Sequence, residues 1–144
     1  MTRDEFLSSV KSNGAVLAPA AEEHMIVIAS SALQSIRCAM LPEFMIDLYK
    51  TAGGLVLGDG YIFGPSELTV TRKFPVPSIV QINNEISGLA QMRGKTVFGR
   101  NDLFWFAFDV FGACFMLDNL TLSQIRKYED PWRALSDCLI IGKM

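Results

Sequence analysis

The sequence predicts an α+β fold, in which helices pack on one side of a central antiparallel sheet of about five to six strands. Apolar residues recur at helical spacing in the first third of the chain and near its end. Between these regions, short apolar runs alternate with turns rich in Gly, Asp and Asn. A chain of 144 residues, 50% of them hydrophobic, is long enough for one core. We therefore expect a single domain over residues 1–144, with its core from about residue 22.

The N-terminus has the signals of a short first helix. Thr2 and Glu5 have the spacing of a capping box, in which the hydroxyl and the carboxylate each bind a free N–H at the helix start. Asn13-Gly14 provides a left-handed stop, so this helix should cover about residues 2–13. Residues 17–19 are expected to form a linker to the next helix.

Two further helices are expected before residue 55. One begins with Pro42 in its first turn, where the missing N–H does no harm, and ends at Gly53-Gly54. The other covers residues 22–36 and precedes it in the chain. Its apolar residues recur at helical spacing: Met25, Ile28, Ala29, Ala32, Leu33 and Ile36.

The pattern then changes from helical to alternating. Residues 55–57 and 61–63 flank Gly58-Asp59-Gly60, whose Asp-Gly pair tolerates the positive φ angles of a tight hairpin. Two short strands are therefore expected here. Residues 68–74 alternate like another strand until Pro75, which would break a hydrogen-bonded ladder. Ser78 should next cap a helix with an apolar face.

Further strands and a closing helix complete the expected fold. Strands are predicted at residues 96–98, 103–108 and 113–117, separated by turns. Asp130-Pro131 combines an N-cap with a first-turn proline, so a helix should follow. Its apolar face consists of Trp132, Leu135, Cys138 and Leu139.

Charge and composition argue against several classes of protein. The net charge is -2, and Lys and Arg are spread along the chain instead of forming a stripe, so no nucleic-acid partner is expected. The N-terminus lacks the basic and apolar regions of a secretory signal. The most apolar stretch, residues 103–117, is about five residues short of the ~20 that span a bilayer. We therefore expect a cytoplasmic protein with no membrane partner.

No motif in the sequence indicates an enzyme active site. The single histidine, His24, has no second metal ligand three or four residues away. A nucleophilic thiol would need His24 close in space to Cys38, Cys114 or Cys138, and the last two stand where small buried hydrophobic residues are expected. No cofactor and no metal are expected, and a thiol hydrolase using Cys38 or Cys114 is the least favoured alternative.

Acidic and aromatic residues have structural explanations as well. Five acidic residues could form a metal or acid–base set: Asp59, Glu67, Asp102, Asp109 and Asp118. Four of them stand at predicted turns or strand ends, where Asp side chains hydrogen-bond their own backbone. The aromatic run 103–108 has no interleaved basic residues for stacking on nucleotides. Phe111 and Phe115 are expected to be buried with it. Both faces of this strand are apolar, and a partner could cover one of them.

Several segments resemble the SUKH superfamily. Residues 41–54, LPEFMIDLYKTAGG, are similar to its signature of Leu-Pro, an amphipathic helix and Gly-Gly. Residues 61–68, YIFGPSEL, look like its strand leading into a short turn. Residues 97–118 look like its glycine-marked central strands, and residues 132–139 are similar to its closing helix. The resemblance covers most of the chain from about residue 22.

The resemblance implies a non-enzymatic binding domain. Bacterial members of this superfamily serve mainly as immunity proteins that neutralise toxins of polymorphic or contact-dependent systems, and other members are regulatory interaction modules. The leading hypothesis is therefore a cytoplasmic immunity protein with a toxin as its protein partner. The alternative is a regulatory scaffold without a toxin. The expected contact is a turn-and-strand face that includes Asp59, Tyr61, Asp102 and Asp118.

Overall fold

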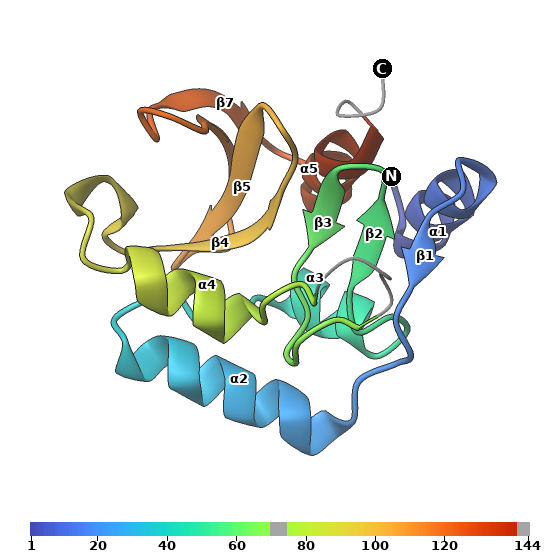
Figure 1. The fold of residues 1–144 in the computed structure, drawn as a ribbon, viewed down its shortest axis with the longest axis horizontal. Helices are drawn as coiled ribbons and strands as arrows, with labels where there is room; N and C mark the ends of the chain where they lie inside the picture. The colour runs from blue at the N-terminus through green and yellow to red at the C-terminus, as the bar shows by residue number, and fades with distance from the viewer. Residues whose placement is uncertain (70–74, 141–144) are drawn as a thin grey trace.

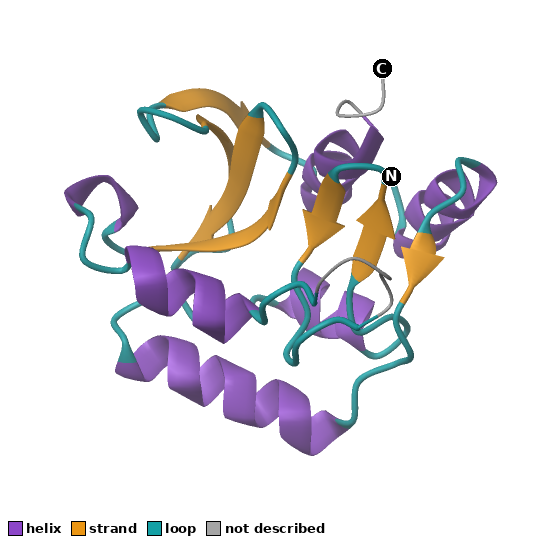
Figure 2. Ribbon diagram, in the orientation of Figure 1, coloured by secondary structure: helices purple, strands orange, loops and turns teal. Residues whose placement is uncertain are grey.

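The computed structural model, which describes residues 1–69 and 75–140, has the predicted α+β fold (Figures 1 and 2). Its antiparallel sheet has seven strands, which lie in chain order from β1 to β7. The strands are β1 (Val16–Leu17), β2 (Leu55–Leu57), β3 (Gly60–Ile62), β4 (Lys95–Arg100), β5 (Phe104–Asp109), β6 (Cys114–Asp118) and β7 (Gln124–Tyr128). The helices are α1 (Arg3–Ser12), α2 (Glu23–Ser35), α3 (Glu43–Tyr49), α4 (Ile79–Ile86), the 3-10 turn η1 (Ala90–Met92) and α5 (Pro131–Ile140).

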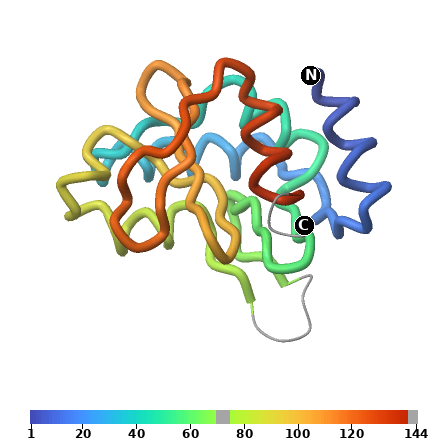
Figure 3. The backbone as a smooth tube through the Cα atoms, turned by 90° about the horizontal axis from the view of Figure 1, so that it is seen from above, coloured from blue at the N-terminus to red at the C-terminus, as the bar shows by residue number. Residues whose placement is uncertain are grey.

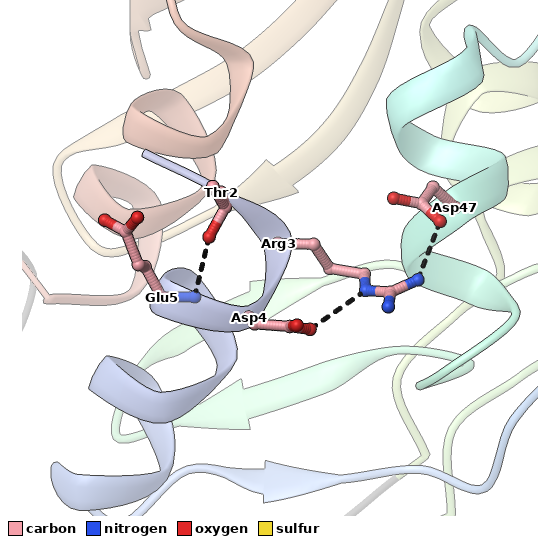
Figure 4. Close-up of polar contacts among 5 residues, drawn as sticks. All are labelled: Thr2, Arg3, Asp4, Glu5 and Asp47. Atoms are coloured by element: carbon pink, nitrogen blue, oxygen red, sulfur yellow. Dashed lines mark hydrogen bonds and ion pairs between the residues drawn. The ribbon is translucent and has the colours of Figure 1, made fainter.

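Capping residues fix the starts of α1, α4 and α5. Thr2 Oγ1 accepts from the Glu5 N–H at 3.1 Å, and Arg3 of α1 then reaches Asp47 of α3 at 2.8 Å (Figure 4). Ser78 and Gln81 form a complete capping box at the start of α4. Asp130 accepts from the Trp132 N–H at 3.0 Å, which confirms the predicted cap of α5.

Helix α5 packs on one face of the sheet and contacts every strand from β2 to β7. Register places one row of residues on this face, namely Ile62, Gly99, Phe106 and Met116. Two glycines allow the close approach. A Cβ at Gly99 would lie 2.7 Å from the Tyr61 carbonyl oxygen and 2.8 Å from Cys138 Sγ, and one at Gly60 would lie 2.9 Å from the Cys138 carbonyl oxygen. Figure 3 shows α5 beside α1, with which it is in contact.

Aromatic rings fill the space between this face and the helices. Phe44 of α3 makes edge contacts with Phe98, Phe108 and Trp132 at 6.2 to 6.3 Å between ring centroids. Phe98 and Phe108 are fully buried, and each contributes roughly 2–3 kcal/mol by burial. Among the aromatic residues predicted to be buried, Phe106, Phe108 and Phe115 are buried, and Phe104 and Trp105 are half-buried. Phe111 is exposed, because it stands in the β5–β6 turn.

The opposite face of the central strands is covered by the chain itself. Val97, Ala107 and Leu117 alternate with the α5-facing residues and are nevertheless fully buried. Helix α4 contacts β4 and is tied to it by Asn83, whose side chain donates to the Val97 carbonyl and accepts from the Val97 N–H, both at 2.8 Å. Helix α2 packs beside α4 (Figure 1). No partner is needed to bury this part of the sheet.

The structure corrects several expectations about local elements. Residues 17–19 are not merely a linker, because β1 pairs with β2 there. Strand β7 was not predicted, since its residues are mostly exposed and lack an apolar alternation. In the β2–β3 turn the positive φ angle belongs to Gly58, at 58°, and not to Asp59. In α2, Ile28 is exposed while Ile26 is buried.

The expected strand over residues 68–74 falls mostly outside the described residues. In the described part, Leu68 forms an isolated bridge with Val76. Within residues 1–69 and 75–140, none of the helices has the length and apolarity required to cross a membrane.

Replacing Gly99 by Ala tests the close packing of α5 on the sheet. The added Cβ would meet a backbone oxygen and a buried sulfur, so Gly99→Ala should lower the free energy of unfolding by about 2–3 kcal/mol. Gly88→Ala is the matched control, because a Cβ there meets nothing within 4 Å. Its effect should stay within about 0.5 kcal/mol. Urea unfolding measures both, and equal effects would contradict the packing argument.

Candidate functional site

Three hairpin turns lie at the same end of the sheet. In a run of antiparallel neighbours, alternate turns share an end, so the β2–β3, β4–β5 and β6–β7 turns are close together. Asp59, Asp102 and Asp118 lie in or next to these turns. The Asn119 side chain donates to the Asp102 carbonyl oxygen at 2.8 Å, which joins two of the turns directly. We call this end, formed by residues 58–59, 101–103 and 118–121, the turn edge.

Asn101 connects the turn edge to the core. Its Oδ1 accepts from the N–H groups of Leu103 and Phe104, both at 2.9 Å, which fixes the β4–β5 turn. Its Nδ2 donates to the Cys138 carbonyl of α5 at 3.1 Å. The side chain is completely buried. Sequence reasoning identified the turn but missed this residue's link to α5, which depends on a contact 37 residues away.

Asp59 and Asp102 form a pair of exposed carboxyl groups on the turn edge. The hydrogen bond that protonated Asp102 donates to Asp59, and then the negative charge of Asp59, raise the pKa of Asp102, and the positive charge of Arg100 opposes this shift. A raised pKa means that the folded protein disfavours the ionised form of Asp102. At neutral pH the pair is therefore a source of repulsion that the fold tolerates.

Asp118 has a different environment from the other two carboxylates. Its Oδ1 accepts from the N–H groups of Leu120 and Thr121 at 2.8 and 3.0 Å. These backbone hydrogen bonds lower the pKa of the Asp118 carboxyl group. Asp118 thus stabilises the β6–β7 turn, which agrees with the structural explanation for acidic residues at turns.

Tyr61 lies on the sheet surface, beside the turn edge. It pairs with Arg100, which pairs with Trp105, so the three side chains form a row on the face opposite α5. Tyr61 and Arg100 also line a shallow hollow of about 100 Å³ together with Ile82. The structure thus places Asp59, Asp102 and Asp118 on one edge, with Tyr61 on the adjoining face.

Two exposed leucines accompany the carboxylates on the turn edge. Leu103 is 57% exposed and Leu120 is 88% exposed. Sequence reasoning missed Leu120 and assigned Leu103 to a strand. The available signal was an apolar residue inside an Asp- and Asn-rich turn. Apolar groups surrounded by charged ones are typical of the surfaces that proteins use to bind each other.

The environments of the three thiols do not favour the thiolate form. Burial raises the pKa of Cys38, raises that of Cys114 to about 12 and raises that of Cys138 well above its ordinary value. A reactive cysteine requires a lowered pKa. His24 is exposed and lies 3.3 Å from Glu22. Among the residues that the structure describes, no three side chains of His, Cys, Asp or Glu gather as a metal site requires.

Replacing Asn101 by Ala should remove the link between α5 and the turn edge. It leaves the Cys138 carbonyl and two turn N–H groups without their buried partner, so we expect a loss of about 2–3 kcal/mol in the free energy of unfolding. Asn119→Ala removes an exposed hydrogen bond to the same turn and should cost less than about 1 kcal/mol. Chemical denaturation of both variants measures the difference. A smaller loss of unfolding free energy for Asn101→Ala than for Asn119→Ala would refute the stabilising link between α5 and the turn edge.

Replacing Asp102 by Asn tests the carboxyl pair. Because the folded-state pKa of Asp102 is raised, its contribution to stability is favourable below its unfolded pKa and is lost as pH rises through the folded pKa. The variant should therefore have a higher Tm than the wild type at pH 7, and the difference should disappear as the pH falls through the range where Asp102 binds its proton. Asp59→Asn should raise the Tm at pH 7 in the same way. The double variant should raise the Tm little further than either single variant, because one substitution already removes the repulsion. A gain in Tm that is independent of pH would contradict the pairing.

Comparison with known proteins assigns no family to the chain. No protein-family model matches the sequence, and no curated protein matches it. The resemblance to the SUKH superfamily therefore stays a prediction.

Proposed function

We propose that this chain is a protein-binding domain of the immunity type, which neutralises a cognate toxin by covering part of the toxin's surface with its turn edge. The observation that supports this most is the Asp59–Asp102 pair, which is held on an ordered edge beside exposed Leu103 and Leu120. Repelling carboxylates and exposed leucines do not favour folding. Residues that do not favour the fold are expected at positions that serve binding instead.

The environment of the thiols supports binding over catalysis. Raised pKa values at all three cysteines disfavour the thiolate that a thiol hydrolase would need. His24 contacts Glu22 through Nδ1, and both of these side chains are exposed on the surface. A binding role needs neither group.

The turn edge is complementary to a basic surface with an apolar centre. Asp59 and Asp102 present negative charge, and the Cys138 carbonyl in the last described turn of α5 meets Asn101 nearby. The carbonyl end of a helix is the negative end of its dipole. A toxin surface with Lys or Arg around an apolar patch would relieve the repulsion between the two carboxylates. Association should therefore slow as the salt concentration rises.

Co-expression with the toxic protein encoded by the neighbouring gene tests this proposal. The wild-type chain should restore growth, and the double variant Asp59→Lys, Asp102→Lys should weaken binding of the purified toxin at least about tenfold. Glu85→Lys on α4 is the matched control, because it reverses an exposed charge outside the turn edge. Killing at full expression of the wild type would end the immunity proposal. Protection that persists unchanged in the double variant would show that another surface binds.

A further inference from the structure

An apolar tip projects at the end of the sheet opposite the turn edge. It is the β5–β6 turn, in which Val110 is 66% exposed and Phe111 is 91% exposed. A fully exposed phenylalanine ring gains nothing for folding, since roughly 150–250 Å² of apolar surface stays in water. The tip is therefore the strongest departure from burial among the aromatic residues that the structure describes.

The turn that presents Phe111 is held rigidly. Asp109 Oδ1 accepts from the Phe111 N–H at 2.9 Å and from the Ala113 N–H at 3.0 Å. The Asp109 carbonyl accepts from the Gly112 N–H at 3.0 Å, and Gly112 takes a φ of 78°. A backbone fixed in this way loses little conformational entropy when its side chain is bound. Phe111 is thus preorganised as an anchor.

A hollow of about 530 Å³ lies directly beside the tip. Its lining includes Phe111 and Ala113 from the tip, together with Lys127, Glu129 and Pro131. The buried residues Cys114 and Tyr128 also belong to its lining. The projecting ring and a space able to receive a ring are therefore neighbours on one face of the molecule.

We propose that the tip binds a second copy of this chain, with Phe111 of each copy seated in the hollow of the other. A two-fold contact uses the same patch on both copies, so it needs an anchor and a receptor side by side, and this patch has both. Its charges are self-complementary. Lys127 and Glu129 form no ion pair within the described residues, and a two-fold axis brings each Lys127 to the Glu129 of the other copy.

The area available sets the strength of this dimer. The two phenylalanine rings and the surfaces that they cover bury roughly 800 Å² of accessible surface in the dimer. The two Val110 side chains bring the total buried area to about 1,000 Å². This is the low end for a specific interface, so the dimer should be weak and reversible, with a Kd of about 10–100 µM. The turn edge lies at the other end of the sheet and stays free in such a dimer.

Sedimentation equilibrium of the full chain tests the proposal, at concentrations from about 5 to 500 µM around the expected Kd. The wild type should pass from monomer to dimer over this range. Phe111→Ser should stay monomeric throughout, with an unchanged circular-dichroism spectrum and Tm, because the ring makes little contact within its own chain. Leu120→Ser is the matched control, since Leu120 is 88% exposed at the opposite end, and its dimerisation should equal that of the wild type.

Charge reversal tests the two-fold geometry independently of Phe111. Lys127→Glu and Glu129→Lys should each weaken the dimer at least about fivefold, because each places like charges opposite one another. The double variant should restore the wild-type Kd. A wild type that is monomeric at every concentration, a dimer that persists in Phe111→Ser, or a double variant that fails to recover would each overturn the proposal.

Discussion

Helix α5 reaches the sheet because Gly60 and Gly99 have no Cβ. A Cβ at Gly60 would meet the α5 backbone at Cys138 and Leu139, and a Cβ at Gly99 would meet the Tyr61 carbonyl oxygen and the Cys138 sulfur. Several other contacts depend on this approach. Cys138 Sγ lies 3.5 Å from the Tyr61 carbonyl, and Asp137 accepts from the Tyr128 hydroxyl at 2.6 Å. The helix thereby links strands that are distant in the chain, and the rings of the core pack around it.

The same contact connects the core to the candidate site. Asn101 can order the β4–β5 turn and bind the Cys138 carbonyl at once because α5 lies close to the sheet. Asp102 and Leu103 follow it directly in the chain, so their position on the turn edge is set by the core. A rigid edge can hold two repelling carboxylates side by side, whereas a mobile loop would let them separate. The turn edge and the Phe111 tip are thus two exposed, ordered surfaces at opposite ends of one sheet.

Local signals in the sequence predicted much of the fold. The caps at Thr2, Ser78 and Asp130 act within three residues, so the helix starts could be located from the sequence alone. Turn residues likewise separated β4, β5 and β6. Strand β7 could not be found in this way, because an edge strand with exposed residues has no apolar alternation. Strand β1 is only two residues long and depends on pairing with β2.

The site was harder to predict because it depends on distant contacts. Asp59 and Asp102 lie together on one surface and their role as contacts stays a prediction, while their mutual repulsion depends on residues 43 positions apart in the chain coming together. Asp118 stabilises its own turn, and Tyr61 lies on the sheet face. Phe111 was wrongly expected in the core, since its aromatic neighbours in the chain are buried.

Native-state hydrogen exchange tests most directly whether α5 and the central strands form one cooperative unit. Amides of α5, β3, β4 and β5 should exchange with the same free energy, within about 0.5 kcal/mol, because separating the helix from Gly60 and Gly99 removes the core of the sheet. If the amides of α5 instead exchanged several kcal/mol more easily than those of β4 and β5, the helix would be a detachable element, and the role assigned to its contact with the glycines would be contradicted.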